Sequence, residues 1–216
     1  QAADAARLAA AVEAANAAVI EAALNGLGKP GMGCTATCAY IENDMLAIAH
    51  VGDSRAYLLH EGTLIRVTRD HSYVEELVDA GEITADEARV HPNRSVITRA
   101  LGSDPAMYAD HFTLHIEEGD RLILCSDGLS SMIPDSEIEN IATQSSTAQI
   151  CVDNLVDAAL AAGGHDNVTV VVVDLVDDGV MREAKRVRRR NVTIAAILGI
   201  AFVLAAAIWA YAGVTG

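Results

Sequence analysis

Three aspartates each lie at or just past the end of an apolar run: Asp53 in HVGDSR, Asp127 in LILCSDG and Asp166 in GGHDNVT. Short apolar runs bounded by turn residues are typical of strands. Strands deliver their terminal side chains to one rim of a sheet, so residues far apart in the sequence can converge there. Converging carboxylates repel each other unless a cation lies between them, and Mg²⁺ and Mn²⁺ prefer oxygen ligands. Taken singly, each aspartate has an ordinary explanation, because Asp-Gly and Asp-Asn are common turn pairs.

The middle of the chain alternates short apolar runs with turns. We predict strands at residues 35–41, 45–51, 55–59, 63–67, 108–116, 121–125 and 167–176, with 108–116 and 121–125 paired across the turn 117–120. We predict helices at 2–24, 72–80, 135–143 and 147–162, and one that opens at Thr84 with a capping box. Runs of strands with segregated helix pairs indicate an α+β fold rather than a doubly wound parallel sheet.

Charge is distributed very unevenly. The formal net charge is −15, yet residues 182–190 hold six basic residues and one acid. The first 180 residues therefore hold nine bases against 29 acids. A body this acidic repels nucleic acid and anionic membrane, so we expect no nucleic-acid partner.

The C-terminal stretch is uncharged from Asn191 to Gly216 and almost wholly apolar from Val192 to Ala212. About 20 apolar residues suffice to cross a bilayer as a helix. We therefore predict a transmembrane helix at 191–214, preceded by a basic juxtamembrane linker at 179–190 that stays in the cytoplasm. The protein would then be a single-pass protein of the cell membrane, with its acidic domain in the cytoplasm and its C-terminus outside. A buried core helix is the alternative.

Six motifs carry a resemblance to a known family: GCTAT from Gly33, VGDSR from Val51, TRDHS from Thr68, TRALG from Thr98, CSDGL from Cys125 and DNVT from Asp166. In this order they resemble the metal-dependent protein serine/threonine phosphatases of type 2C, over roughly residues 31–176. The resemblance implies a four-layer α/β/β/α sandwich within residues 1–178, in which helix pairs flank a central antiparallel β-sandwich. Residues 71–99 resemble the mobile flap of bacterial members, and we call them the flap segment.

The resemblance also implies a set of metal ligands. Asp127 and Asp166 correspond to carboxylate ligands of a binuclear Mn²⁺ or Mg²⁺ centre. Asp53 corresponds to the residue that helps to hold a third, weaker ion in bacterial members, and Ser95 falls where the flap segment can contribute to that site. Asn167 and Gly128 are expected beside the ligands rather than on the metal, with Asn167 orienting the Asp166 turn.

The implied activity is hydrolysis of phosphoserine and phosphothreonine in proteins by a metal-activated water molecule. The implied partners are phosphorylated proteins, including membrane serine/threonine kinases. A cysteine-based phosphatase is a weak alternative, because the loop after Cys125 lacks the arginine that a phosphate-binding loop would need. Two alternatives from other classes remain: a catalytically dead phosphatase-like domain that binds phosphorylated partners at the membrane, and a membrane-anchored interaction domain with an acidic surface.

The sequence departs from the family pattern in its first 32 residues. The family has there another metal-bridging aspartate, an Asp-Gly pair and a phosphate-binding arginine, and none of these is recognisable before Gly33. We therefore expect this chain to be an N-terminally truncated fragment of a longer enzyme and to be inactive by itself.

Overall fold

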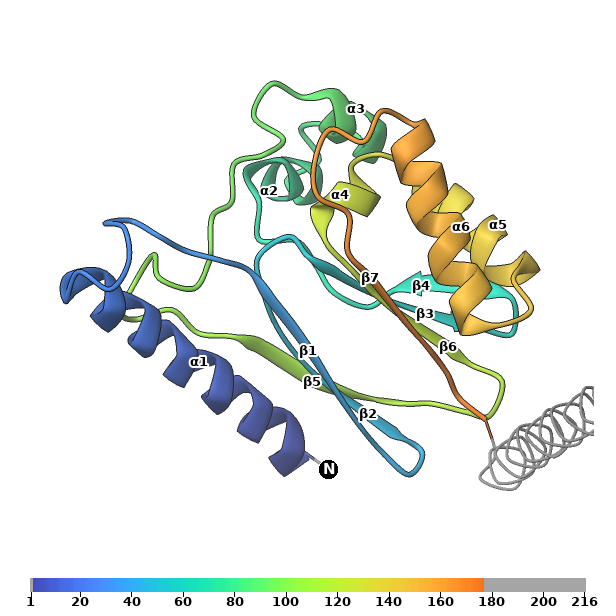
Figure 1. Cartoon of the computed structure of the whole chain (residues 1–216), viewed down its shortest axis with the longest axis horizontal. Coiled ribbons are helices and arrows are strands. Elements are labelled where there is room, and N and C mark those ends of the chain that lie inside the picture. The colour runs from blue at the N-terminus through green and yellow to red at the C-terminus, as the bar shows by residue number, and fades with distance from the viewer. Residues whose placement is uncertain (1, 177–216) are drawn as a thin grey trace, which may run out of the picture. The chain divides into compact units, whose positions relative to one another are not determined.

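The computed structural model describes residues 2–176, which are coloured in Figure 1. Residues Gln1–Leu175 form one compact unit. The predicted basic linker at 179–190 and the predicted transmembrane helix at 191–214 lie outside the described residues. Among residues 2–176, no helix is both long and apolar enough to span a bilayer.

Within the described residues, seven strands form two sheets in which every pairing is antiparallel. The first sheet has the order β1 (Ala36–Glu42), β2 (Met45–Val51), β5 (Asp110–His115). The second has the order β4 (Thr63–Arg66), β3 (Arg55–His60), β6 (Arg121–Cys125), β7 (Val170–Asp174). Two antiparallel sheets with separate helices confirm the predicted α+β class.

The predicted pairing of 108–116 with 121–125 is wrong. β5 pairs with β2, whereas β6 lies in the other sheet between β3 and β7. The connection crosses between the sheets: the Ile116 N–H donates to the Asp44 carbonyl (2.9 Å), and the Gly119 N–H donates to the Leu175 carbonyl (2.8 Å). Ile116 is buried in the core between the sheets. A hairpin and a crossover can use the same turn residues, so the local sequence does not distinguish them.

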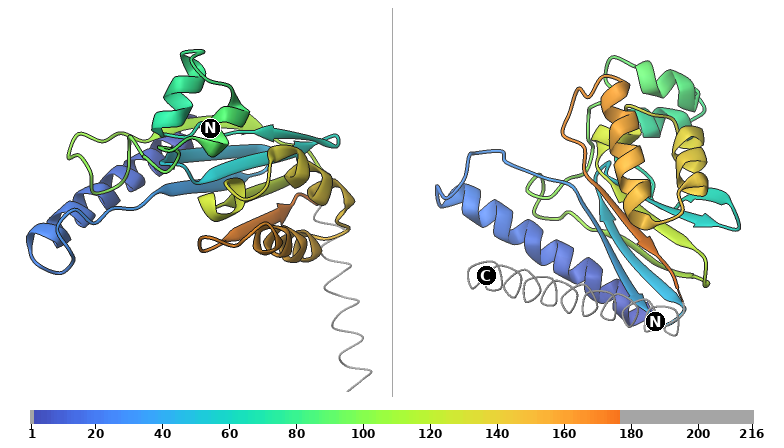
Figure 2. Two further views of the ribbon diagram at one scale, coloured as in Figure 1. Left: turned by 90° about the horizontal axis from the view of Figure 1, so that it is seen from above. Right: turned by 45° about the vertical axis from the view of Figure 1, so that its right-hand side comes forward.

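Helices cover the outer faces of the two sheets (Figures 1 and 2). The first sheet packs against α1 (Ala2–Leu24), and the second packs against α5 (Asp135–Gln144) and α6 (Ala148–Ala161). Because side chains alternate along a strand, each strand can serve two cores. Leu58 and Leu122 face the core between the sheets, whereas Tyr57 and Ile123 face α5 and α6.

Three short helices lie near the ends of the strands. The flap segment contains α2 (Tyr73–Asp79) and α3 (Ala85–Val90), and a single turn, α4 (Asp127–Ser130), follows β6 directly. The capping box predicted at Thr84 is present, with Glu87 as its partner. α4 was not predicted, because its four residues are too few to show a helical period.

Candidate metal centre

The register of the second sheet brings three loops to one edge. Arg55 at the start of β3 pairs with Cys125 at the end of β6, and Cys125 pairs in turn with Val170 at the start of β7. The loops that precede β3, follow β6 and precede β7 therefore meet at this edge. These loops carry the three aspartates that were predicted as metal ligands.

The loops that carry Asp127 and Asp166 are bonded to each other through Ser126. The Ser126 hydroxyl donates to the Asn167 carbonyl (3.2 Å) and accepts from the Thr169 N–H (3.0 Å). The Asn167 N–H donates to Asp166 Oδ1 (2.7 Å). Asn167, predicted to orient the Asp166 turn, thus makes its contacts here through the main chain. The hydrogen bonds of Ser126 therefore hold the loop that carries Asp127 against the loop that carries Asp166.

Gly128 allows these two loops to approach each other closely. A Cβ atom at this position would lie 2.3 Å from the Asn167 carbonyl oxygen and 3.3 Å from Val168 Cα. Real Cβ atoms do not come that close to a backbone oxygen, so a larger residue would push the loops apart. Gly128 therefore allows the close contact of the two loops by having no side chain, and its place beside bound metal ions stays a prediction.

Asp53 is half-buried at the same edge, whereas Asp127 and Asp166 are exposed. Burial raises the pKa of Asp53 to about 6, and the charges of Asp127 and Asp70 add to this effect. A carboxyl group in this setting is ionised only at a cost, which a nearby cation would offset. The donors are oxygen atoms, which suits a hard divalent ion such as Mn²⁺ or Mg²⁺.

The described residues do not form a closed metal site. Within residues 2–176, no group of three or more Asp, Glu, His or Cys side chains is arranged to hold a metal ion. The three aspartates therefore share an edge without completing a coordination sphere. Ser95 is exposed in the turn after α3, and no hydrogen bond of the described residues joins it to Asp53.

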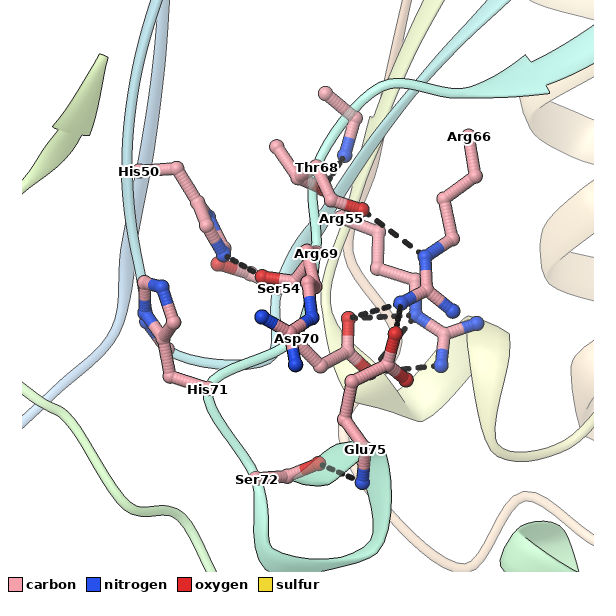
Figure 3. Close-up of polar contacts among 12 residues, drawn as sticks. His50, Ser54, Arg55, Arg66, Thr68, Arg69, Asp70, His71, Ser72 and Glu75 are labelled. Carbon is pink, nitrogen blue, oxygen red and sulfur yellow. Dashed lines mark hydrogen bonds and ion pairs between the residues drawn. The ribbon is translucent and has the colours of Figure 1, made fainter. Parts of the chain in front are cut away.

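A second group of residues, none of which was predicted as a metal ligand, anchors the strand that follows Asp53 (Figure 3). Arg55 binds both carboxylate oxygens of Asp70, through Nε to Oδ1 (3.0 Å) and Nη2 to Oδ2 (2.7 Å). Arg55 Nη1 also donates to the Tyr57 hydroxyl (3.1 Å), which donates to Asp135 Oδ1 (2.9 Å). The signal in the sequence was the TRDHS motif that contains Asp70.

Cys125 is buried at the end of β6. Burial raises the pKa of its thiol to about 12, so the thiol is protonated at neutral pH. A buried, protonated thiol is a poor nucleophile. The structure thus gives an independent reason against the cysteine-based phosphatase considered above.

Comparison with known proteins shows the family. The family model for protein phosphatase 2C matches residues 8–168. The chain belongs to the protein phosphatase 2C family, as the six motifs indicated.

Named relatives and a solved structure agree with this assignment. The chain is 40% identical over 144 residues to the serine/threonine phosphatase stp of Listeria welshimeri, covering 67% of this chain and 57% of the relative. It is 43% identical over 175 residues to the serine/threonine protein phosphatase PstP of Mycobacterium tuberculosis, covering 80% of this chain and 33% of the relative. A solved catalytic domain of PstP, in complex with two manganese ions, matches with a TM-score of 0.72 and 39% identity, covering 80% of this chain and 71% of that one. The chain thus spans from one third to somewhat over half of the length of these two relatives.

Proposed function

We propose that the complete protein hydrolyses phosphoserine and phosphothreonine in other proteins, with Mn²⁺ or Mg²⁺ as its cofactor. The observation that carries this proposal is the placement of Asp53, Asp127 and Asp166 on loops that meet at one sheet edge, in a chain of the protein phosphatase 2C family. Relatives named as serine/threonine phosphatases and the PstP domain with two manganese ions support it.

In this proposal each residue has a defined role. Asp127 and Asp166 hold two divalent ions, and Asp53, with Ser95, holds a third ion more weakly. Gly128 keeps the loops of Asp127 and Asp166 at the distance that a shared pair of ions requires. When bound, the ions lower the pKa of a water molecule and neutralise charge on the phosphoryl oxygens.

We further propose that these 216 residues alone do not turn over substrate. The support is that no described group of three side chains can hold a metal ion, and that the chain spans about half of the length of the Listeria relative. Further ligands would then come from residues outside this sequence. The same residues would complete the four-layer sandwich, in which a helix pair covers each sheet.

We also propose that the enzyme is anchored in the cell membrane by a helix at 191–214, with its catalytic domain in the cytoplasm. The support is the uncharged stretch, the basic residues before it and the acidic body. Its substrates would be phosphorylated cytoplasmic proteins, including membrane serine/threonine kinases whose phosphorylated segments lie close to the bilayer.

Hydrolysis of a phosphothreonine peptide by the full-length protein tests the activity. Turnover should disappear in excess chelator and return when Mn²⁺ or Mg²⁺ is restored. Turnover that persists in excess chelator would contradict the role of the metal. A protein that binds the phosphopeptide in saturating Mn²⁺ without hydrolysing it would instead be the catalytically dead binding domain.

A further inference from the structure

The turn that carries Asp53 connects the two sheets, because it runs from the end of β2 to the start of β3. Gly52 has a φ of +108°, and a Cβ atom there would lie 2.3 Å from Thr35 Cγ2. The position therefore requires glycine, which offers neighbouring residues only its backbone N–H and carbonyl. Gly52 itself can therefore form hydrogen bonds with its neighbours only through these two backbone groups.

His71 binds both of them. The Gly52 carbonyl accepts from the backbone N–H of His71 (2.7 Å), and the Gly52 N–H donates to His71 Nδ1 (3.0 Å). The preceding residue, Asp70, holds Arg55 on the far side of Asp53. Figure 3 shows the side chains of Asp70 and His71 reaching in different directions from neighbouring positions. Asp53 thus lies between Gly52, which is bonded to His71, and Arg55, which is bonded to Asp70.

The imidazole of His71 is itself held in one orientation. Because Nδ1 accepts from Gly52, the ring proton is assigned to Nε2, which lies 3.0 Å from Asp110 Oδ2. Asp110 also accepts from Arg99 Nη1 (2.6 Å), and the Arg99 guanidinium lies 4.1 Å from the centre of the Tyr108 ring. The imidazole therefore has an acidic partner on one side and a backbone donor on the other.

The two ends of the flap segment also meet at His71. The His71 carbonyl accepts from the Thr98 N–H (2.9 Å), and the Tyr73 N–H donates to the Val96 carbonyl (2.9 Å). Arg99, at the end of the segment, shares Asp110 with His71 as an acceptor, because Arg99 Nη1 donates to Asp110 Oδ1 and His71 Nε2 donates to Asp110 Oδ2. His71, the first residue of the flap segment, thus contacts the Asp53 turn, β5 and the other end of the segment at Thr98.

We propose that His71 is a positioning residue for Asp53, and that it ties the Asp53 turn to the base of the flap segment. Through Nδ1 it holds the Val51–Gly52 peptide, and through its backbone N–H it holds the Gly52–Asp53 peptide that follows. Its own carbonyl joins these peptides to Thr98. Loosening the Nδ1 contact should therefore weaken metal binding at Asp53 and leave the ions at Asp127 and Asp166 in place. This inference rests on the proposed metal centre.

Two substitutions test the contacts of the two ring nitrogens of His71 separately. His71→Asn keeps an acceptor near the position of Nδ1 but does not reach Asp110, whereas His71→Gln reaches towards Asp110 and loses the acceptor at Gly52. His60→Gln is the matched control, because His60 lies at the opposite end of β3 and bonds to Asp120. Asp53→Ala supplies the reference for loss of the weaker metal site.

Two measurements on the full-length protein test the proposal. The first is amide exchange of Gly52 by NMR with ¹⁵N-glycine labelling, which should be roughly tenfold faster in His71→Gln than in wild type, His71→Asn or His60→Gln. The second is calorimetric titration with Mn²⁺, in which His71→Gln should weaken only the site that Asp53→Ala removes, again by roughly tenfold.

Three outcomes of these two measurements would contradict a part of the proposal. If His71→Asn and His71→Gln are equally impaired, His71 acts by packing and the proposal is wrong. If exchange at Gly52 rises in His71→Gln while Mn²⁺ binding stays that of wild type, His71 holds the turn without positioning Asp53, and the proposal is again wrong. If Asp53→Ala itself leaves Mn²⁺ binding unchanged, the assignment of Asp53 as a metal ligand fails, and the Gly52 exchange still reports whether the Nδ1 contact exists.

Discussion

A methyl group at position 128 would collide with the loop that carries Asp166. Gly128 has no unusual backbone angle, so an alanine there would be strained by contact alone, against the Asn167 carbonyl oxygen at 2.3 Å. The loops could separate to make room, but Ser126 bonds them together on the other side. The spacing between the Asp127 and Asp166 loops thus depends on one missing side chain.

We predict that Gly128→Ala lowers the free energy of unfolding by about 1–3 kcal/mol, the usual cost of overpacking. Turnover of the full-length enzyme should fall by about 100-fold, because a small displacement of a catalytic group is enough for such a loss. Urea unfolding and phosphopeptide kinetics measure the two effects. Ser146→Ala, between α5 and α6, removes an exposed hydroxyl and is the control. A Gly128→Ala enzyme with wild-type turnover would contradict this account of the loop spacing.

His50 is buried in the first sheet next to the His71 ring, at 4.9 Å between ring centres. Burial, together with the charge of the neighbouring His71, lowers its pKa from 6.5 to about 4, against opposing contributions from the hydrogen bond to the Arg69 carbonyl and from Asp70 and Asp110. Between these two pH values the unfolded chain binds a proton that the folded chain does not. Folding stability should therefore decrease as the pH falls from 6.5 to 4.

We predict that the His50→Gln variant lacks the part of the pH dependence of stability that comes from His50. Wild type should lose about 2 kcal/mol more stability than the variant between pH 7 and pH 5, at about 1.4 kcal/mol per unit of pH. Urea unfolding of both proteins at the two pH values measures the difference, in which the titration of other groups largely cancels. Equal losses in the two proteins would show that His50 binds a proton equally well in the folded and unfolded states.

The sequence predicted the location of the aspartates better than it predicted what surrounds them. Residues at strand ends have positions that follow from the strand itself, so Asp53, Asp127 and Asp166 could be expected at one edge. Asp70 and His71 act through partners 15 and 19 residues away, Arg55 and Gly52. Such contacts depend on how the flap segment returns to the sheet, which no local pattern encodes. The contribution of Ser95 remains a prediction for the same reason.

At the scale of elements, α1 is held to the body by a polar contact as well as by its apolar face. Asn16 is buried on this helix, and its side chain accepts from the Gly102 N–H (2.7 Å) and donates to the Asp104 carbonyl (2.8 Å). These bonds attach the loop before β5 to α1. Without them, two backbone groups of that loop would lose their partners.

We expect Asn16→Ala to lower the free energy of unfolding by about 1–3 kcal/mol, because it removes two hydrogen bonds and leaves the partly buried Gly102 N–H without its partner. The exposed Asn25→Ala, just after the same helix, should change it by less than about 0.5 kcal/mol. Denaturant unfolding monitored by circular dichroism compares the two. Equal effects would mean that the polar contact of Asn16 contributes nothing beyond helix propensity.

The elements themselves were largely predictable, and their partners were not. Residues 2–24 and 45–51 were predicted with the bounds that α1 and β2 have, because the periods of apolar residues are local. β5 and β6 were predicted as strands but with the wrong neighbours, because pairing is decided by burial of Ile116 and other residues between the sheets. Local pattern fixes where strands occur, and the shared core fixes which strands meet.

On the scale of the whole molecule, the main prediction concerns orientation in the membrane. A basic linker at 179–190 before an apolar stretch at 191–214 should keep the phosphatase domain in the cytoplasm. A reporter that works only in the oxidising exterior should give signal when fused after Gly216 and none when fused before Gln1. The reverse pattern would overturn the proposed localisation.

The central claim is that Asp127 and Asp166 hold the tightly bound ions and that Asp53 does not. Calorimetric titration of Mn²⁺ into the full-length protein tests it most directly, with wild type, Asp127→Asn and Asp53→Ala compared under the same conditions. Asp127→Asn keeps the shape of the side chain and removes its charge. We predict that wild type and Asp53→Ala both bind two ions tightly and that Asp127→Asn loses this binding. Tight binding of two ions by Asp127→Asn, or its equal loss in Asp53→Ala, would contradict the account.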